Sequence, residues 1–176
     1  MTAFPAAAFP FRDAMALLAT GVTVVTVETP RGPAGMTASA VCSLSLEPPK
    51  LVACVQRSLP THAALLSSST FAVNVLGEEG VDTARRFATP GVDRFAGIAL
   101  RNEGRAPVLA EAIAYFLCEI DERHPGGDHS IFVGRVLGCG HEPRRRPLLY
   151  FERTFEALKD PDDLVMRSWA ETGTQV

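Results

Sequence analysis

The sequence predicts a mainly β protein, an antiparallel barrel or sandwich with short helices at its ends. Runs of apolar and β-branched residues recur along the chain, and turn-forming residues separate them. The intervening segments allow only short helices and do not repeat as β–α–β units, which argues against a parallel sheet. With 176 residues, 47% of them hydrophobic, the chain is long enough to bury the core of one domain.

A short helix is expected at the start of this domain. Proline suits the first helical position, so the helix should begin near Pro10, and Phe11, Met15 and Leu18 follow at helical spacing. Gly21 stands where a residue in the left-handed conformation commonly ends a helix, so we expect it to act as the cap.

The strands are predicted from composition and from the breaks between them. Residues 22–27 are β-branched throughout, turn residues 31–33 follow, and two prolines at 48–49 interrupt the chain before a third strand. Strands are expected at 22–27, 35–41, 51–55, 71–76, 112–120, 130–137 and 147–151. Short helices are expected at 61–67, at 78–88 and after Asp160, the last carrying Trp169, with irregular loops at 89–103 and 124–129.

Charge and apolar content argue against several classes of function. The formal net charge of −3 and the pI of about 5.8 provide no basic surface for nucleic acid or an anionic membrane. No apolar run reaches the ~20 residues of a membrane-spanning helix. Residues 1–11 lack the basic and long apolar regions of a signal peptide. We therefore expect a cytoplasmic protein.

The four cysteines do not follow a metal-site pattern. Zinc ligands come in closely spaced pairs, and the sequence contains none. We expect no metal, and buried, reduced thiols at Cys42, Cys54, Cys118 and Cys139.

Motifs for the common forms of catalysis are also missing from the sequence. It contains no Walker loop, no GxGxxG after a strand, no GxSxG elbow and no HExxH helix. Any catalysis is therefore expected to depend on a bound organic cofactor.

Three segments carry polar groups suited to a flat, anionic ligand. Residues 36–45 are small and rich in hydroxyls, which would let a ring approach the backbone, but a Ser/Thr-rich edge strand explains them equally. Residues 56–62 combine hydroxyls, an arginine and a helix start, which suits either an anion site or an ordinary helix cap. His129, in the polar loop that contains residues 127–129, is either a ligand-facing or a solvated residue, and Tyr150 suits a core or a pocket.

In this order, the segments resemble the short-chain flavin reductases, the reductase components of two-component flavin-dependent monooxygenases. Each motif is weak alone, but nine in the right succession are hard to obtain by chance. They are 11–15 (FRDAM), 20–26 (TGVTVVT), 35–39 (GMTAS), 42–45 (CSLS), 48–49 (PP), Ser58 with Thr61-His62, 71–76 (FAVNVL), 107–109 (PVL) and 127–129 (GDH). The resemblance covers residues 9–158, which we expect to form one domain with terminal extensions at 1–8 and 159–176.

The resemblance implies an FMN-binding split β-barrel of the antiparallel Greek-key type with helices at its ends. It also implies a homodimer with flavin near the subunit interface. The implied activity is that of an NAD(P)H:flavin oxidoreductase, which transfers hydride from NADH or NADPH to N5 of FMN or FAD. The reduced flavin would then diffuse to a partner monooxygenase.

The same resemblance assigns the site residues. It places the flavin ring against Thr37, Ser39, Ala40, Val41 and Cys42, with Ser43 and Ser45 supporting that turn. It places the ribityl phosphate at Gln56, Arg57, Ser58 and Thr61, with Arg86 as a further partner. It places His129 beside the nicotinamide as the catalytic residue, with Tyr150 bordering the pocket.

One position departs from the family pattern: Leu59 stands where relatives often carry a small polar residue, which removes a possible hydroxyl contact to the phosphate. Two other functions stay open at this point. The protein could retain its flavin and reduce a substrate of its own, or it could bind and store flavin without turnover.

Overall fold

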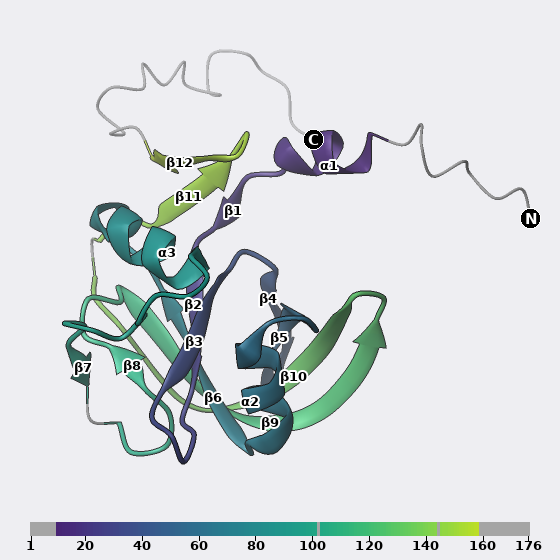
Figure 1. Ribbon diagram of the computed structural model, residues 1–176, viewed down its shortest axis with the longest axis vertical. Helices are drawn as coiled ribbons and strands as arrows, with labels where there is room; N and C mark the ends of the chain where they lie inside the picture. The colour runs from purple at the N-terminus through teal and green to yellow at the C-terminus, as the bar shows by residue number, and fades with distance from the viewer. Residues whose placement is uncertain (1–9, 102, 144, 159–176) are drawn as a thin grey trace, which may run out of the picture.

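The computed structural model describes residues 10–101, 103–143 and 145–158. It confirms the mainly β prediction, because its largest unit is a seven-stranded antiparallel sheet in the order β3-β2-β6-β9-β10-β5-β4 (Figure 1). These strands are β2 (Thr23–Val27), β3 (Ala34–Ala38), β4 (Val41–Leu46), β5 (Pro49–Gln56), β6 (Thr70–Val75), β9 (Ala114–Gly126) and β10 (His129–His141). The sheet curls until β3 contacts β5, which gives an incompletely closed barrel.

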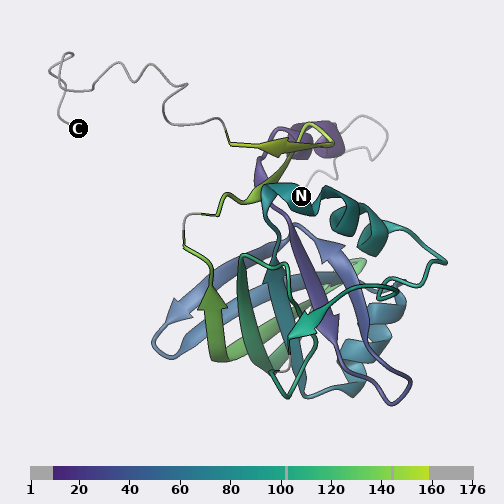
Figure 2. The ribbon, with the colours of Figure 1, turned by 90° about the vertical axis from the view of Figure 1, so that its left-hand side faces the viewer.

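Helix α2 (Pro60–Ser67) covers the opening of this barrel and contacts β2, β3 and β5 (Figures 1 and 2). Its Leu65 is almost completely buried and packs into the barrel core with Val25, Phe71 and Phe132. Burial of side chains of this size contributes about 1.5–3 kcal/mol each. The helix is therefore held by the core rather than by the intrinsic stability of eight residues.

A second core lies outside the barrel, beneath α3 (Val81–Ala88). Ala84 and Phe87 of this helix pack with Val24 of β2, whereas the next residue, Val25, points into the barrel. Because β2 is buried on both faces, its sequence is continuously apolar and β-branched rather than alternating.

Short elements complete one end of the barrel. Strands β1 (Thr20–Gly21), β11 (Leu148–Phe151) and β12 (Thr154–Ala157) form a three-stranded sheet there, with helix α1 (Phe11–Ala16) beside it (Figure 1). Elsewhere, the 3-10 helix η1 (Glu78–Gly80) precedes α3, and β7 (Leu100–Arg101) pairs with β8 (Val108–Leu109).

The prediction that Gly21 caps the first helix is wrong. Helix α1 ends at Ala16, and Gly21 lies in β1 opposite Leu149. Strand pairing therefore replaces the left-handed cap. No residue of α1 is buried, and Phe11 and Met15 are 58% and 46% exposed, so these two side chains do not join the cores of the described structure.

The polar segment 124–129 is not the irregular loop that its composition predicts. Strands β9 and β10 pair to their tip, with His124 opposite Ile131, so only Gly127 and Asp128 form the turn. Backbone pairing sustains this ribbon without burial, because residues 121–128 are exposed. The expected strands 112–120 and 130–137 are therefore too short.

Five strands of the described structure were not predicted: the two-residue strands β1, β7 and β8, and the longer strands β4 and β12. Strand β4 was expected only as an alternative for the hydroxyl-rich segment, and it forms an edge of the sheet. Strand β12 follows a turn at Glu152 and Arg153, which adopt positive φ angles of 49° and 65° without any glycine to signal it.

The expectation of four buried cysteines is correct only in part. Cys118 is buried, and burial raises the pKa of its thiol to about 12. Cys54 is half-buried, whereas Cys42 and Cys139 are exposed because they lie on outward-facing positions of β4 and β10.

Two further sequence predictions concern helices: that none spans a membrane, and that a short helix follows Asp160. Within the described ranges, the structure contains no helix with the length and apolarity that a membrane crossing requires. The helix expected after Asp160 lies outside the described residues.

Candidate functional site

The three polar segments meet at one end of the barrel. The N–H of Cys54 donates to the carbonyl oxygen of Ala40 at 2.9 Å, which places the start of β4 beside the end of β5. Gln56 pairs with His129 across β5 and β10, and the N–H of Arg57 donates to the carbonyl oxygen of Asp128 at 3.0 Å. Segments separated by up to 90 residues in the sequence therefore form one continuous strip.

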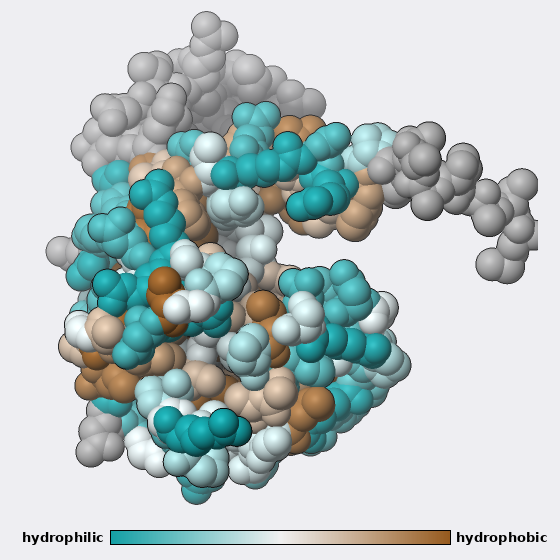
Figure 3. Space-filling model, viewed as in Figure 1, coloured by the Kyte–Doolittle hydropathy of each residue, from teal (hydrophilic) through white to brown (hydrophobic). Residues whose placement is uncertain are grey.

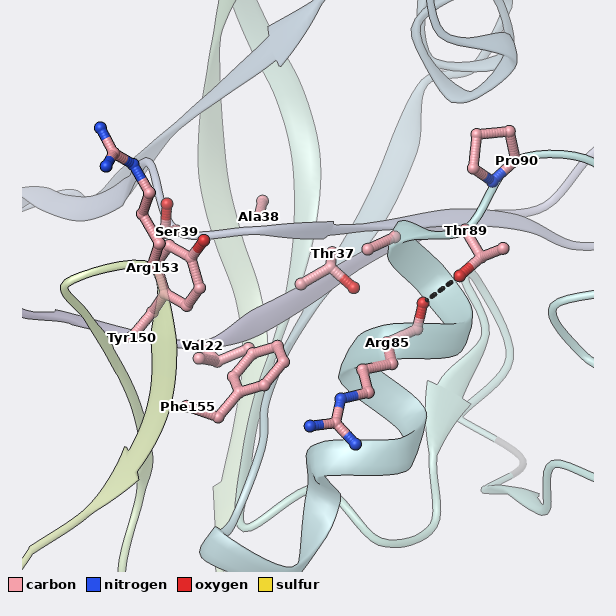
Figure 4. Close-up of a pocket in the computed structure, with 11 residues that line it drawn as sticks. Val22, Thr37, Ala38, Ser39, Arg85, Thr89, Pro90, Tyr150, Arg153 and Phe155 are labelled. Atoms are coloured by element: carbon pink, nitrogen blue, oxygen red, sulfur yellow. Dashed lines mark hydrogen bonds between the residues drawn. The ribbon is translucent and has the colours of Figure 1, made fainter. Parts of the chain in front are cut away.

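A cavity of about 570 Å³ adjoins this strip between α3, β3 and the β11–β12 turn (Figure 4). This volume lies within the ~300–1,000 Å³ range of small-molecule sites. Of the residues predicted to bind cofactor, Thr37, Ser39 and Tyr150 line it. The other lining residues are Val22, Ala38, Arg85, Ala88, Thr89, Pro90, Arg153 and Phe155.

The cavity continues under α1. A neighbouring hollow shares Ser39, Tyr150 and Arg153 with it and is lined further by Phe11, Met15 and other residues of the α1 region. Figure 3 shows this open space between α1 and the barrel, with apolar surface on the underside of the helix. Together, the cavity and the hollow form a groove across the end of the barrel.

The walls of the cavity carry positive charge. Arg85 extends toward Phe155, with its guanidinium carbon 5.9 Å from the ring centroid, and Arg153 stands at the opposite rim beside Ser39 and Tyr150 (Figure 4). Arg153 forms an ion pair with Asp13 of α1. No acidic side chain lines the cavity itself among the described residues.

His129 lies at the other end of the strip, half-buried at the start of β10. Its Nδ1 is 2.7 Å from Oδ1 of Asp128, and this contact lowers the pKa of the Asp128 carboxyl group. The contact orients the ring and leaves Nε2 without a hydrogen-bond partner in the described part of the chain. The second ring nitrogen is therefore available for a further hydrogen bond.

A buried hydrogen bond links the second segment to the third. His62 of α2 and Ser130 of β10 are 8% and 9% exposed, and Nε2 of His62 lies 2.9 Å from Oγ of Ser130. The imidazole also packs edge-on against Phe132, with ring centroids 5.8 Å apart. The helix that follows the predicted phosphate segment is thus fixed to the strand that carries His129.

The remaining predicted residues divide by position. Along the strip, the exposed ones are Ser39, Ala40, Cys42, Gln56, Arg57 and Ser58, and Val41 is half-buried. Thr61 is 1% exposed, so its hydroxyl is less accessible than the prediction requires. Ser43 and Ser45 pair with Leu51 and Lys50, further down β4, and are not brought to the barrel end.

Arg86 is also placed away from the cavity. Its guanidinium donates to the carbonyl oxygen of Ala96, whereas the side chain of its neighbour Arg85 lines the cavity. Thr83, Ala84 and Phe87 form the buried face of α3, so both arginines point outward, in different directions. The sequence predicts an arginine contact from this part of α3, and only the orientation of the helix decides that Arg85 rather than Arg86 lines the cavity.

The residues of the strip fit a flavin. Small side chains at Ser39 and Ala40 leave room for a flat ring, and the edge position of β4 leaves backbone groups available. At the start of α2, Leu59 supplies no side-chain cap, so the first turn of the helix is open to an anionic group.

Comparison with known proteins agrees with this fit. The profile of the flavin reductase like domain matches residues 15–159. The reductase component of a 4-nitrophenol monooxygenase from Rhodococcus opacus is 40% identical over 149 residues, covering 82% of this chain and 78% of that protein. A flavin reductase (NADH) from Kitasatospora aureofaciens is 41% identical over 150 residues, covering 82% and 78%.

Solved structures extend the similarity to the fold. An NADH:FAD oxidoreductase from Streptomyces globisporus, in complex with NAD and FAD fragments, superposes with a TM-score of 0.80 at 38% identity, covering 86% of this chain and 92% of that one. The styrene monooxygenase flavin reductase from Pseudomonas putida gives a TM-score of 0.81 at 32% identity, covering 87% and 99%. With its fold and most of its length shared with these proteins, the chain belongs to the flavin reductase-like family.

Proposed function

We propose that this protein is an NADH-dependent flavin reductase that supplies reduced flavin to a partner monooxygenase. The observation that carries the proposal is the meeting of segments 37–42, 56–61 and 128–129 at one end of the barrel, beside a positively charged cavity. Relatives named as flavin reductases and as reductase components support the same activity. FMN, FAD and NADPH complete the set of nucleotides to be tested.

The proposed binding mode follows from the order of the segments. The flavin ring lies on the small residues 39–42, and its phosphate lies at Arg57, Ser58 and the start of α2. Thr37 and Tyr150 border the ring from the cavity side. Arg57 supplies a positive charge and Ser58 a hydroxyl to the phosphate, and charge-assisted hydrogen bonds of this kind contribute about 1.5–3 kcal/mol each.

The chain needs little acid–base chemistry for this reaction. When bound together, the two nucleotides supply the hydride donor and acceptor themselves. The residues of the strip would need only to hold the reacting atoms of the two rings roughly 3–3.5 Å apart, which is an effect of orientation. Backbone N–H groups and hydroxyls of the strip stabilise the negative charge of the product. His129, oriented by Asp128, positions the nicotinamide through Nε2.

We further propose that the enzyme is a cytoplasmic homodimer. Helix α1 exposes Phe11 and Met15, the two residues Leu17 and Leu18 after it are 62% and 57% exposed, and the edge strand β4 exposes Leu44 and Leu46. A second copy covering these surfaces would bury apolar area and close the groove from outside. Light scattering at micromolar concentration should give the mass of a dimer, and a monomer would contradict this part of the proposal.

The activity is tested by following NADH and NADPH absorbance with added FMN or FAD. We expect flavin-dependent oxidation of NADH by protein that purifies with little bound flavin, since a diffusing product must be released. A folded protein inert with all four pairings would refute the proposal. A yellow protein that oxidises NADH only with a third substrate would indicate a flavoprotein that retains its flavin.

A further inference from the structure

The end of α3 is joined to the edge strand β3 by the side chain of one arginine. Arg94 follows the helix in sequence and is half-buried. Its Nη1 donates to the carbonyl oxygen of Gly35 in β3 at 2.6 Å. Its Nε and Nη2 donate to the carbonyl oxygen of Thr89, the cap residue of α3, at 3.3 Å and 3.2 Å. One guanidinium group therefore connects the strand to the end of the helix.

Both elements that Arg94 connects are walls of the cavity beside the strip (Figure 4). Strand β3 and the residue after it contribute residues 37–39, and the end of α3 with the two residues after it contributes residues 88–90. Arg94 itself is not a lining residue. It can therefore affect a ligand in this space only through the walls that it holds together.

Other contacts attach the earlier part of α3 to the strand. The hydroxyl of Thr37 donates to the carbonyl oxygen of Ala84 at 2.6 Å. Phe87 packs so closely on Gly35 that a Cβ atom at this glycine would lie 2.9 Å from the ring. Beyond Phe87, Arg94 makes the only hydrogen bonds between this end of the helix and β3 in the part of the chain that the structure describes. Its loss would therefore free the last turn and leave the rest of the helix attached.

The bonding pattern requires the planar fork of an arginine. Partial burial lowers the pKa of the Arg94 guanidinium, and no carboxylate pairs with it among the described residues. Two carbonyl oxygens face the charge instead, one of them at the C-terminal end of α3, where the helix dipole favours a cation. A lysine ammonium keeps the charge but does not present several N–H groups in one rigid plane.

We propose that Arg94 is a positioning residue for flavin reduction, which sets the width of the cavity by holding the end of α3 against β3. The inference rests on the proposed function, in which Thr37 borders the flavin ring from this cavity. Without the bonds of Arg94, the wall at residues 88–90 is free to move away from β3, and the stacked rings lose part of their support. A misplacement of about 1 Å caused far from the reacting atoms can cost about 10²-fold in rate.

Steady-state kinetics of Arg94→Ala with NADH and FMN test the effect on binding. We expect the KM for both nucleotides to rise and kcat/KM to fall about 10–100-fold, with kcat at saturation nearly unchanged. A purely structural role would instead lower kcat through loss of folded protein and leave KM as in the wild type. A rise in KM for one nucleotide alone would also support the inference. Arg94→Lys should recover only part of the loss.

Gly35→Ala tests the same wall from the side of the strand. The added methyl group would press on the ring of Phe87 and move α3 away from β3 while Arg94 stays in place. We expect the same rise in KM. The effects of Gly35→Ala and Arg94→Ala should be less than multiplicative in the double variant, because both changes open the same wall.

Hydrogen exchange of the ligand-free protein measures the loosening without turnover. Amides of residues 85–90 should exchange faster in Arg94→Ala, whereas those of β6 should exchange as in the wild type. Arg101→Ala is the matched control, because its guanidinium also donates to two carbonyl oxygens, those of Ala110 and Ala112, outside the cavity. This control should leave both KM values and the exchange of α3 unchanged.

Two results would overturn the inference about Arg94. The first is exchange at residues 85–90 that is the same in Arg94→Ala and the wild type, and the second is faster exchange with both KM values unchanged. Failure of the proposed function is a different outcome, because the wild-type protein itself would then oxidise no NADH in the presence of flavin.

Discussion

Replacing Ser130 by alanine tests whether the phosphate segment and the His129 strand act as one unit. The substitution removes the buried 2.9 Å contact with His62 and leaves a ring nitrogen of His62 without a partner. An unsatisfied buried polar group costs about 1–3 kcal/mol. For a domain of this size, a loss of 2 kcal/mol lowers Tm by about 4–8 °C. We also expect a several-fold higher KM for NADH, because His129 adjoins the altered residue.

The assay is a double-mutant cycle with Ser130→Ala, His62→Gln and the double variant, read by thermal denaturation and by steady-state kinetics. The two residues should couple by about 0.5–3 kcal/mol in stability, since they touch. Ser67→Ala is the matched control, because its hydroxyl contacts only the Ala63 carbonyl on the exposed face of α2. Additive effects in both stability and the KM for NADH would refute the coupling.

Three further results follow from buried and ionised groups. Asn74 is completely buried and makes three hydrogen bonds, one of them from the Leu109 N–H. Asn74→Ala should therefore lower the free energy of unfolding, measured in urea, by about 3–5 kcal/mol, and a loss under about 1 kcal/mol would contradict this role of Asn74. The lowered pKa of the Asp128 carboxyl group contributes stability above the ordinary aspartate pKa of about 3.9, and this stability is lost as pH falls through the lower pKa of the folded state. Asp128→Asn should therefore make the stability of the protein depend less on pH in the acid range. Urea midpoints that change equally with pH in the variant and in the wild type would contradict the contact. A thiol reagent should modify exposed Cys139 rapidly in native protein and Cys118 only after unfolding, as mass spectrometry of the labelled peptides would show.

The barrel strands could be predicted because their sequences satisfy a local rule. Residues 22–27 are β-branched throughout and residues 71–76 are apolar except for Asn74, which suits strands buried on both faces, and the structure has β2 and β6 there. The ribbon tip at residues 124–129 could not be predicted, because backbone pairing rather than apolar periodicity sustains it. Likewise, nothing in the composition at Glu152 indicates the turn before β12.

The segments that form the site could be predicted from the sequence, but most of the side chains that line the cavity could not. The order of motifs singled out the segments 36–45, 56–62 and 127–129, whereas the pairing of Gln56 with His129 is known only from the structure. Arg86 was predicted to contact the flavin phosphate, but its guanidinium donates to the carbonyl oxygen of Ala96, and the neighbouring Arg85 lines the cavity, because one step along a helix turns a side chain by about 100°. Arg153 reaches the site through a hairpin that the sequence does not signal.

The most direct test of the central claim is anaerobic stopped-flow reduction of flavin by NADH at the absorbance of the oxidised ring. We predict that the protein bleaches one equivalent of FMN or FAD per NADH, and that His129→Ala slows bleaching at low NADH while approaching the wild-type rate at saturation. A protein that leaves the flavin oxidised, or a His129→Ala variant that matches wild type at every NADH concentration, would contradict the account.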